Sequence, residues 1–215
     1  MSVARKEILK ALEEMRANRG ERNFKQSIDL IINLKDLDLK RPENRVNLTV
    51  NLPHGTGKGQ KVCVFATGDL ALRARKAEVD LVVDQDQLKD LSANRKEAKK
   101  MLSNYDLFLA ESSLMPVVGR VAGPILGPRG RMPTPVPSNA PIEQIIERQK
   151  NIVPLRSRDK PLIQLSIGTE DIDDEKLAEN IETVLSTLIG SLKRGMTNIR
   201  SIYLKPSMGA PVRLK

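Results

Sequence analysis

Side chains suited to nucleophilic, redox and metal chemistry are scarce in this sequence of 215 residues, which contains one cysteine, Cys63, and one histidine, His54. A single cysteine cannot form an internal disulfide bond, which is consistent with a reducing cytoplasm. A single histidine leaves little for a zinc site or for a serine–histidine relay. The carboxylates are scattered over helix faces, and the sequence places no pair of them at acid–base distance. We therefore expect a protein that is not an enzyme and that has no metal site and no cofactor.

Long apolar runs are missing as well. No run approaches the roughly 20 residues that a membrane-spanning helix needs. The first 15 residues, MSVARKEILKALEEM, lack the apolar core of a signal peptide. These absences predict a cytoplasmic protein with no membrane partner.

Aromatic residues are the third scarcity, with three phenylalanines, two tyrosines and no tryptophan. In contrast, basic residues are plentiful: the formal net charge is +9 and the isoelectric point is near 9.7. Such a charge favours a polyanionic partner. Proteins that read single strands by stacking bases on rings use more aromatic residues than this chain has. If the partner is RNA, we expect the protein to recognise its backbone and shape.

The two ends of the chain predict half-exposed strands and amphipathic helices. Ile8, Leu12 and Met15 lie at helical spacing, and residues 27–34 and 45–52 both alternate apolar and polar side chains. The two alternating runs predict an antiparallel pair. Near the C-terminus a strand at PLIQLSIG, a helix over 171–190 and a strand at NIRSIYLK follow one another. Together the two ends predict a four-stranded antiparallel sheet with two helices, close to the split βαβ arrangement.

The middle of the chain has a different pattern. The short apolar runs KVCVFA, VDLVV and YDLFLA are separated by helical stretches, which is typical of a small parallel sheet covered by helices. The predicted fold class is therefore α/β with two domains. A split βαβ-type antiparallel α+β sandwich, residues 1–58 and 156–215, is interrupted by a Rossmann-like parallel α/β domain, residues 59–155. Both domains are basic, with formal charges of +6 and +3.

A glycine-rich segment, GTGKG, lies at the first crossing between these domains and contains Gly55, Gly57 and Gly59. The phosphate-binding Walker pattern needs Ser or Thr after the Gly-Lys pair, where this chain has Gly59. The dinucleotide pattern needs a further glycine where Gln60 stands. We interpret the three glycines as a hinge.

Residues 119–137 read GRVAGPILGPRGRMPTPVP and contain four glycines, five prolines, three arginines and no acidic residue. This composition predicts a rigid loop that is neither helix nor strand. Its apolar residues argue against a flexible linker. We expect Arg120, Arg129 and Arg131 to project from the loop without a local carboxylate partner.

Two stretches, GPILGPRGRMP and the C-terminal SIYLKPSMGAP, resemble the large-subunit ribosomal protein one family, whose members form the mobile stalk beside the transfer-RNA exit site. The resemblance covers essentially the whole chain, and Pro124 and Thr134 match the archaeal form. It implies a structural protein of the large ribosomal subunit that binds large-subunit ribosomal RNA mainly through the interrupted domain. The residues that match family contacts are Phe24, Ser27, Lys160, Gly168, Ser201, Ser207, Met208 and Gly209.

The chain departs from the common pattern at two places. Asn23 replaces the basic residue that often precedes the phenylalanine, and Lys205, Pro206 and Ser207 replace threonines that are common in bacterial members. The hydroxyl group is retained at Ser207. The three arginines of residues 119–137 are expected to make a secondary, salt-sensitive RNA contact.

The resemblance also implies further partners and a location. The expected partners are exit-site tRNA, whose deacylated form the protein helps to release, and the protein's own mRNA, whose translation it represses. We expect a ribosome-associated protein in the cytoplasm that is monomeric when free. Two alternatives remain at this point: a nucleotide-binding enzyme with its ligand near Ala66 or Ala110, and a structural adaptor that binds protein.

Overall fold

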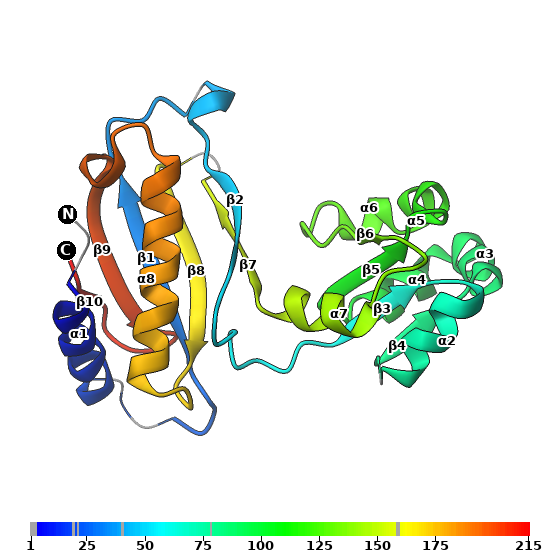
Figure 1. Ribbon diagram of the computed structural model, residues 1–215, viewed down its shortest axis with the longest axis horizontal. Helices are drawn as coiled ribbons and strands as arrows, with labels where there is room; N and C mark the ends of the chain where they lie inside the picture. The colour runs from blue at the N-terminus through cyan, green and yellow to red at the C-terminus, as the bar shows by residue number, and fades with distance from the viewer. Residues whose placement is uncertain (1–3, 19, 21, 40, 78, 158–159) are drawn as a thin grey trace. The chain divides into compact units, whose positions relative to one another are not determined.

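The computed structural model describes residues 4–18, 20, 22–39, 41–77, 79–157 and 160–215. The chain divides into two compact units (Figure 1): Met1–Lys58 with Asn151–Lys215, called here the first unit, and Gly59–Lys150, the inserted unit. The first unit contains an antiparallel sheet built from both ends of the chain, and the inserted unit contains a parallel sheet. The predicted fold class is confirmed.

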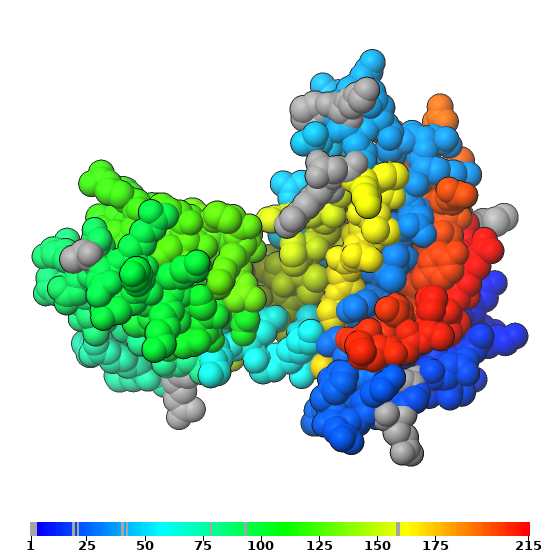
Figure 2. All heavy atoms as spheres, turned by 180° about the vertical axis from the view of Figure 1, so that it is seen from behind, coloured from blue at the N-terminus to red at the C-terminus, as the bar shows by residue number. Residues whose placement is uncertain are grey.

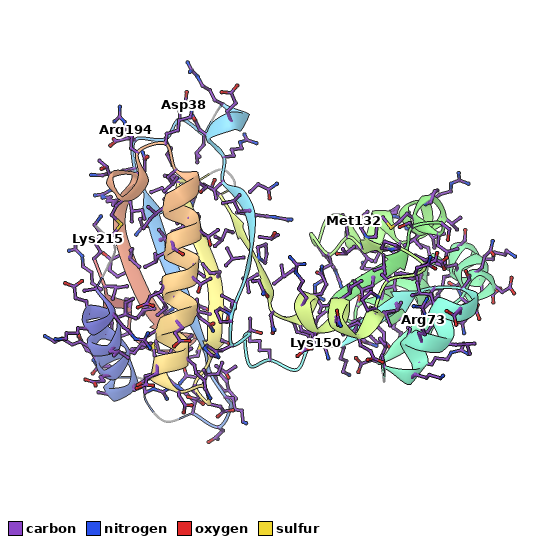
Figure 3. All side chains as sticks on the ribbon, in the orientation of Figure 1. Asp38, Arg73, Met132, Lys150, Arg194 and Lys215 are labelled. Carbon is purple, nitrogen blue, oxygen red and sulfur yellow. The ribbon has the colours of Figure 1, made fainter. Side chains whose placement is uncertain are left out.

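The chain returns to the first unit five residues earlier than the sequence-based boundary at residue 156. Lys150, labelled in Figure 3, is the last residue of both helix α7 (Ile142–Lys150) and the inserted unit. Strand β7 (Ile152–Arg156) follows at once and pairs with β2 (Asn47–Asn51) in an antiparallel ladder. Backbone hydrogen bonds to β2 therefore assign residues 151–155 to the first unit.

The main sheet of the first unit has one buried and one solvent-facing side. Its strand order is β10-β9-β1-β8, with β1 (Ser27–Leu34) and β9 (Ile199–Pro206) at the centre and β8 (Leu162–Thr169) and β10 (Val212–Arg213) at the edges. Every second residue of β1 is buried, because period-two alternation sends those side chains to one side of the sheet. Helices α1 (Arg5–Ala17) and α8 (Asp174–Ser191) cover this side and complete the core (Figure 1).

The other side of this sheet is called the open face. Alternation places Ser27, Asp29, Ile31 and Asn33 on it, and all four are partly exposed. The view from behind in Figure 2 looks onto β8, β1 and β9, whose yellow, blue and orange atoms lie at the surface. The open face is available to a partner of the first unit.

The predicted antiparallel pair between the two N-terminal alternating runs is wrong. Strand β1 pairs with β8 and β9, whereas β2 pairs, among the described residues, with β7 alone in a separate two-stranded ladder. The fourth strand of the main sheet is β10 instead of β2. Alternation determines which side of a strand is buried, but it contains no information on which strand will be the neighbour.

The inserted unit is a parallel sheet with helices on both sides. The strand order is β4-β3-β5-β6, from Leu81–Val83, Val62–Phe65, Leu107–Glu111 and Thr134–Val136. All four residues of β3 are buried, because Cys63 and Phe65 belong to one apolar cluster and Val62 and Val64 to another. The helices are α2 (Gly68–Lys76), α3 (Gln85–Ala93), α4 (Arg95–Leu102), α5 (Met115–Val121), α6 (Gly123–Leu126) and α7.

Residues 119–137 are more regular than predicted. They include the end of α5, all of α6 and strand β6, so the interpretation as a loop without helix or strand is wrong. Two of the prolines occupy positions where no backbone N–H is needed. Pro124 lies in the first turn of α6, and Pro135 lies in β6 at the edge of the sheet.

Candidate nucleic-acid interface

The structure brings together the start of β1 and the turn at residues 206–209, although Ser27 and Ser207 are 180 positions apart in the sequence. The carbonyl oxygen of Ser27 accepts hydrogen bonds from the backbone N–H of Ser207, at 2.9 Å, and from its hydroxyl, at 3.2 Å. Within the turn, the N–H of Gly209 donates to the carbonyl of Pro206 at 3.2 Å. Ser27, Ser207, Met208 and Gly209 therefore form one site.

Two large apolar side chains are exposed at this site. Phe24 is 52% exposed and Met208 is 60% exposed, and they are the exposed large hydrophobic residues among the described part of the first unit. Phe24 lies three residues before Ser27, and Met208 follows Ser207, so the two hydrogen-bonded segments each carry an exposed apolar side chain, which is typical of a surface that a partner covers. We call Phe24, Ser27, Ser207, Met208 and Gly209 the strand-end patch.

Two further predicted residues lie at the opposite end of the sheet. Ser201 on β9 is paired with Asn33 on β1, and the side-chain amide of Asn33 donates to the Ser201 hydroxyl at 2.9 Å. Lys160 lies two residues before β8, whose first residue is opposite Asn33. Six residues of extended strand separate Ser27 from Asn33, which corresponds to about 20 Å. The predicted contacts therefore fall into two groups, at the two ends of the open face.

The middle of the open face connects these two groups, and the sequence analysis missed it. Asp29, Ile31, Gln164, Ser166 and Lys205 line a shallow depression there. Burial raises the pKa of the half-buried Asp29, and the positive charges of Lys58 and Lys205 oppose this rise. The alternation that places Ser27 on this face also places Asp29 and Ile31 there, so this signal was present in the sequence.

Gly168 has a different environment from the other predicted contacts. It is buried in β8, and a Cβ atom at this position would lie 2.5 Å from Cδ2 of Leu177 and 3.1 Å from Cδ1 of Ile172. Leu177 belongs to α8, on the core side of the sheet. In the structure, the missing side chain of Gly168 allows α8 to pack closely on β8.

The three glycines of the predicted hinge also differ from one another. Gly55 and Gly57 have φ angles of 61° and 67°, in the left-handed region that favours glycine. A Cβ at Gly55 would meet the side chain of Asn151, and one at Gly57 would meet that of Thr169, so both are packed against the first unit. A Cβ at Gly59 would meet nothing within 4 Å. The part of this segment where a side chain would meet no neighbouring atoms therefore begins after Gly57.

Two of the three arginines of residues 119–137 have partners that their local sequence does not indicate. Arg131 forms an ion pair with Asp106 at 3.2 Å and donates to the carbonyl of Tyr105 at 2.8 Å. Arg129 donates to the Ser103 hydroxyl at 3.0 Å. The expectation of no local carboxylate is therefore wrong for Arg131. The missed carboxylate lies 25 residues earlier in the sequence and meets Arg131 only because β5 and β6 are neighbours.

The inserted unit provides a test of the nucleotide-binding alternative. In parallel sheets of this kind, ligands bind where helices begin beyond the strand ends. At the start of α2 this place is occupied by the buried carboxylate of Glu111, which accepts from the N–H and the hydroxyl of Thr67 at 3.0 and 2.9 Å and from the Ser138 hydroxyl at 2.9 Å. Burial would raise the pKa of Glu111, but hydrogen bonds from Thr67, Ser113 and Ser138 outweigh it and hold the pKa below its usual value. Glu111 thus places a buried negative charge beside the start of α2, and this charge would repel a phosphate there.

The described part of the chain offers neither a metal site nor a membrane-spanning helix. Within the described ranges, no group of three or more His, Cys, Asp or Glu side chains could hold a metal ion. None of the helices in that part of the chain is long and apolar enough to cross a membrane.

A family model and several individual proteins match nearly the whole length of this chain. The model of the family described as "Ribosomal protein L1p/L10e family" matches residues 11–210. The chain is 47% identical over 208 residues to large ribosomal subunit protein uL1 of Methanothermobacter thermautotrophicus, with 97% of this chain and 98% of the relative covered. It is 50% identical to the uL1 protein of Methanothrix thermoacetophila, covering 90% and 91% of the two chains. It is 45% identical to the uL1 protein of Pyrococcus horikoshii, and the match covers 100% of this chain and 98% of that relative.

Proposed function

The chain belongs to the ribosomal protein L1p/L10e family, and we propose that it carries out its function, as an RNA-binding protein of the large ribosomal subunit, with the open face and the strand-end patch of the first unit. The family resemblance predicted from the sequence is thereby confirmed, and the chain is not an enzyme. The observation that carries the proposal is the pair of hydrogen bonds from Ser207 to the Ser27 carbonyl. These bonds unite two segments that each contain an exposed apolar side chain.

The chemistry of the patch suits the shallow groove of an RNA helix. The N–H groups of Ser207, Met208 and Gly209 are all bonded within the protein, to Ser27, Gln26 and Pro206. The turn therefore presents acceptors, namely the lone pairs of the Ser207 hydroxyl and backbone carbonyl oxygens. Ribose 2′-hydroxyls are donors displayed along that groove, and RNA helices are recognised through them and through shape. The missing side chain of Gly209 allows close approach of a bulky partner.

The second group, Ser201 and Lys160, gives the surface its length. We propose that one RNA element lies along the open face, with the strand-end patch at one end and Lys160 and Ser201 at the other. Lys160 supplies a positive charge for a phosphate, whereas Ser201, 7% exposed, supplies a fixed hydroxyl. Gly168 supports this surface from the core side. The overall charge of +9 adds attraction that is independent of RNA sequence and sensitive to salt.

We also propose that the same face binds the protein's own mRNA. An mRNA segment folded into the same shape as the ribosomal site would meet the same acceptors and would compete for them. Binding of that segment would then repress translation. Competition between the two RNAs for the strand-end patch is the expected signature.

A separate proposal concerns exit-site tRNA. Arg120 and Arg129 are exposed on the inserted unit, although Arg129 also bonds Ser103. These two cations are the candidates for a secondary contact with RNA or with tRNA during release of the deacylated form. Arg131, which is held by Asp106, contributes less because its charge is already paired.

The test of the main proposal is the affinity for a folded stalk fragment of archaeal large-subunit ribosomal RNA and for an unrelated RNA duplex, measured over a range of salt. We expect the protein to prefer the stalk fragment strongly at all salt concentrations. The variant Ser207→Ala/Met208→Ala/Gly209→Ala should lose about 1–3 kcal/mol per lost contact on the stalk fragment and little on the duplex. Equal binding of both RNAs by the unaltered protein, or an unchanged affinity of this variant, would overturn the proposal.

A further inference from the structure

Gln26 is a buried polar residue beside the strand-end patch, and neither the sequence motifs nor the comparisons assign it a role. It is 1% exposed and lies between Phe24 and Ser27. Its backbone N–H donates to a carboxylate oxygen of Glu170 at 3.1 Å, and its carbonyl accepts from the N–H of Glu170 at 3.0 Å. Its side-chain oxygen Oε1 accepts from the backbone N–H of Met208 at 3.1 Å. Gln26 therefore links three segments: the start of β1, the turn near residue 170 and the turn at 206–209.

The bond from Met208 to Gln26 complements the bond from Ser207 to Ser27. Gln26, immediately before β1, and Ser27, the first residue of β1, thereby hold two successive N–H groups of the 206–209 turn. The turn already continues from β9, which is paired with β1, and Ser207 is bonded to Ser27; the added bond at the Met208 N–H fixes the tilt of the residues that follow. The tilt matters because Met208, although its N–H points inward, exposes 60% of its surface.

We propose that Gln26 is the positioning residue of the RNA site. Its side-chain oxygen holds the Met208 backbone so that the Met208 side chain and the Ser207 hydroxyl already occupy their binding positions before RNA binds. A surface that is already ordered binds more tightly, because less conformational freedom is lost on binding. The inference rests on the proposed function of the strand-end patch.

The position of Gln26 argues against a role in core packing. The first residue that β1 contributes to the core is Ile28. Gln26 lies two residues earlier, so its side chain falls on the same side of the chain as that of Ile28, but it precedes the first residue of the strand. A side chain at this position could have been apolar if packing alone mattered. The amide oxygen instead accepts from the Met208 N–H. The other two N–H groups of the turn already have partners: that of Ser207 donates to Ser27, and that of Gly209 donates to Pro206.

The decisive variant is Gln26→Met, which keeps the length of the side chain and removes the acceptor. We expect the stalk fragment to bind about tenfold more weakly, because the Met208 N–H loses its partner. Affinity for the unrelated duplex, which depends on charge, should stay within about twofold because no charge changes. The matched control is Gln144→Met on the exposed side of α7, which should bind both RNAs as the unaltered protein does.

A measurement without RNA tests the same contact. Hydrogen exchange of the Met208 amide, followed by NMR, should be slow in the unaltered protein and much faster in Gln26→Met. Amides at the centre of β1 and β9 should exchange as before. Gln26→Glu retains an acceptor oxygen and should keep the Met208 amide protected, so this variant remains informative if Gln26→Met folds poorly.

A combined variant separates positioning from a direct contact or a purely structural role. If Gln26 acts through the turn that it positions, adding Gln26→Met to the Ser207→Ala/Met208→Ala/Gly209→Ala variant should weaken stalk-fragment binding by less than about twofold further. Additive losses, or an unchanged Met208 amide, would overturn the inference. So would full affinity of Gln26→Met in an experiment where the 207–209 triple variant loses binding. If the triple variant also binds fully, the proposed function itself fails.

Discussion

The buried side-chain amide of Asn180 donates to the backbone carbonyls of Gly55, at 3.0 Å, and of Ile167, at 2.9 Å. Its oxygen accepts from the backbone N–H of His54 at 3.2 Å. One fully buried residue of α8 therefore fastens the segment leading to the inserted unit onto the main sheet. Beside it, His54 Nε2 lies 2.6 Å from a carboxylate oxygen of Glu179. The segment before Gly57 is thus part of the first unit and not a free connection.

Asn180→Ala should destabilise the first unit. Three hydrogen bonds are lost, and buried backbone groups at His54, Gly55 and Ile167 lose their partner, so the free energy of unfolding should fall by at least about 2 kcal/mol. Urea unfolding measures this change. Asn139→Ala, in an exposed turn of the inserted unit, is the control and should change stability by less than about 0.5 kcal/mol. Equal stability of the two variants would show that the Asn180 bonds contribute nothing.

The glycines of the crossing segment should differ sharply in their tolerance of alanine. Gly57→Ala forces a left-handed φ on alanine and places Cβ 2.6 Å from the Thr169 hydroxyl oxygen, so it should cost about 1–2 kcal/mol or more. Gly59→Ala has no such φ and meets no neighbour, so it should change the free energy of unfolding by less than about 0.5 kcal/mol. Thermal and urea unfolding of both variants provide the comparison. The structure is contradicted here if Gly59→Ala is the more damaging change.

Gly168→Ala should act on packing. The new methyl group would lie 2.5 Å from Leu177, so the variant should lose about 1–3 kcal/mol of stability. Shortening the neighbour in Gly168→Ala/Leu177→Val should recover part of this loss, with a coupling of at least about 0.5 kcal/mol between the two changes. Below the unfolding transition, the folded fraction of Gly168→Ala should still bind the stalk fragment. Simple additivity in the double variant would argue against the packing role.

Glu111 should make the stability of the inserted unit depend on pH. The pKa of this carboxyl is lower in the folded protein than its ordinary value of 4.5, so its stabilising effect is complete above that value. It is lost as the pH falls through the folded pKa, where the carboxylate takes up a proton. Glu111→Gln should therefore be less stable than the unaltered protein at pH 7, and the difference should shrink progressively below pH 4.5. Urea unfolding between pH 3 and 7 tests this, and a difference that grows on acidification would reverse the assignment.

Several features of the candidate site follow from the sequence. The motif at 207–209 and the Phe24 and Ser27 positions were identified through the family resemblance. In contrast, Gln26 had no signal, because a glutamine at the start of a strand is ordinary in sequence. Its importance comes from Met208, which lies 182 positions away. The partner of Arg131 was missed for the same reason, since strand neighbours determine it.

Local sequence by itself determined the sides of the strands, the amphipathic helices, the parallel character of the inserted sheet and the family. These properties depend on side-chain periodicity and on motifs within a few residues, where burial of apolar groups acts directly. Only the tertiary structure decided that β1 lies between β8 and β9, that β2 pairs with β7, and that Gly55 and Gly57 are fastened instead of free. The physical reason is that strand partners and buried polar bonds are chosen by the summed burial and hydrogen bonding of the whole unit, so no short segment contains that choice.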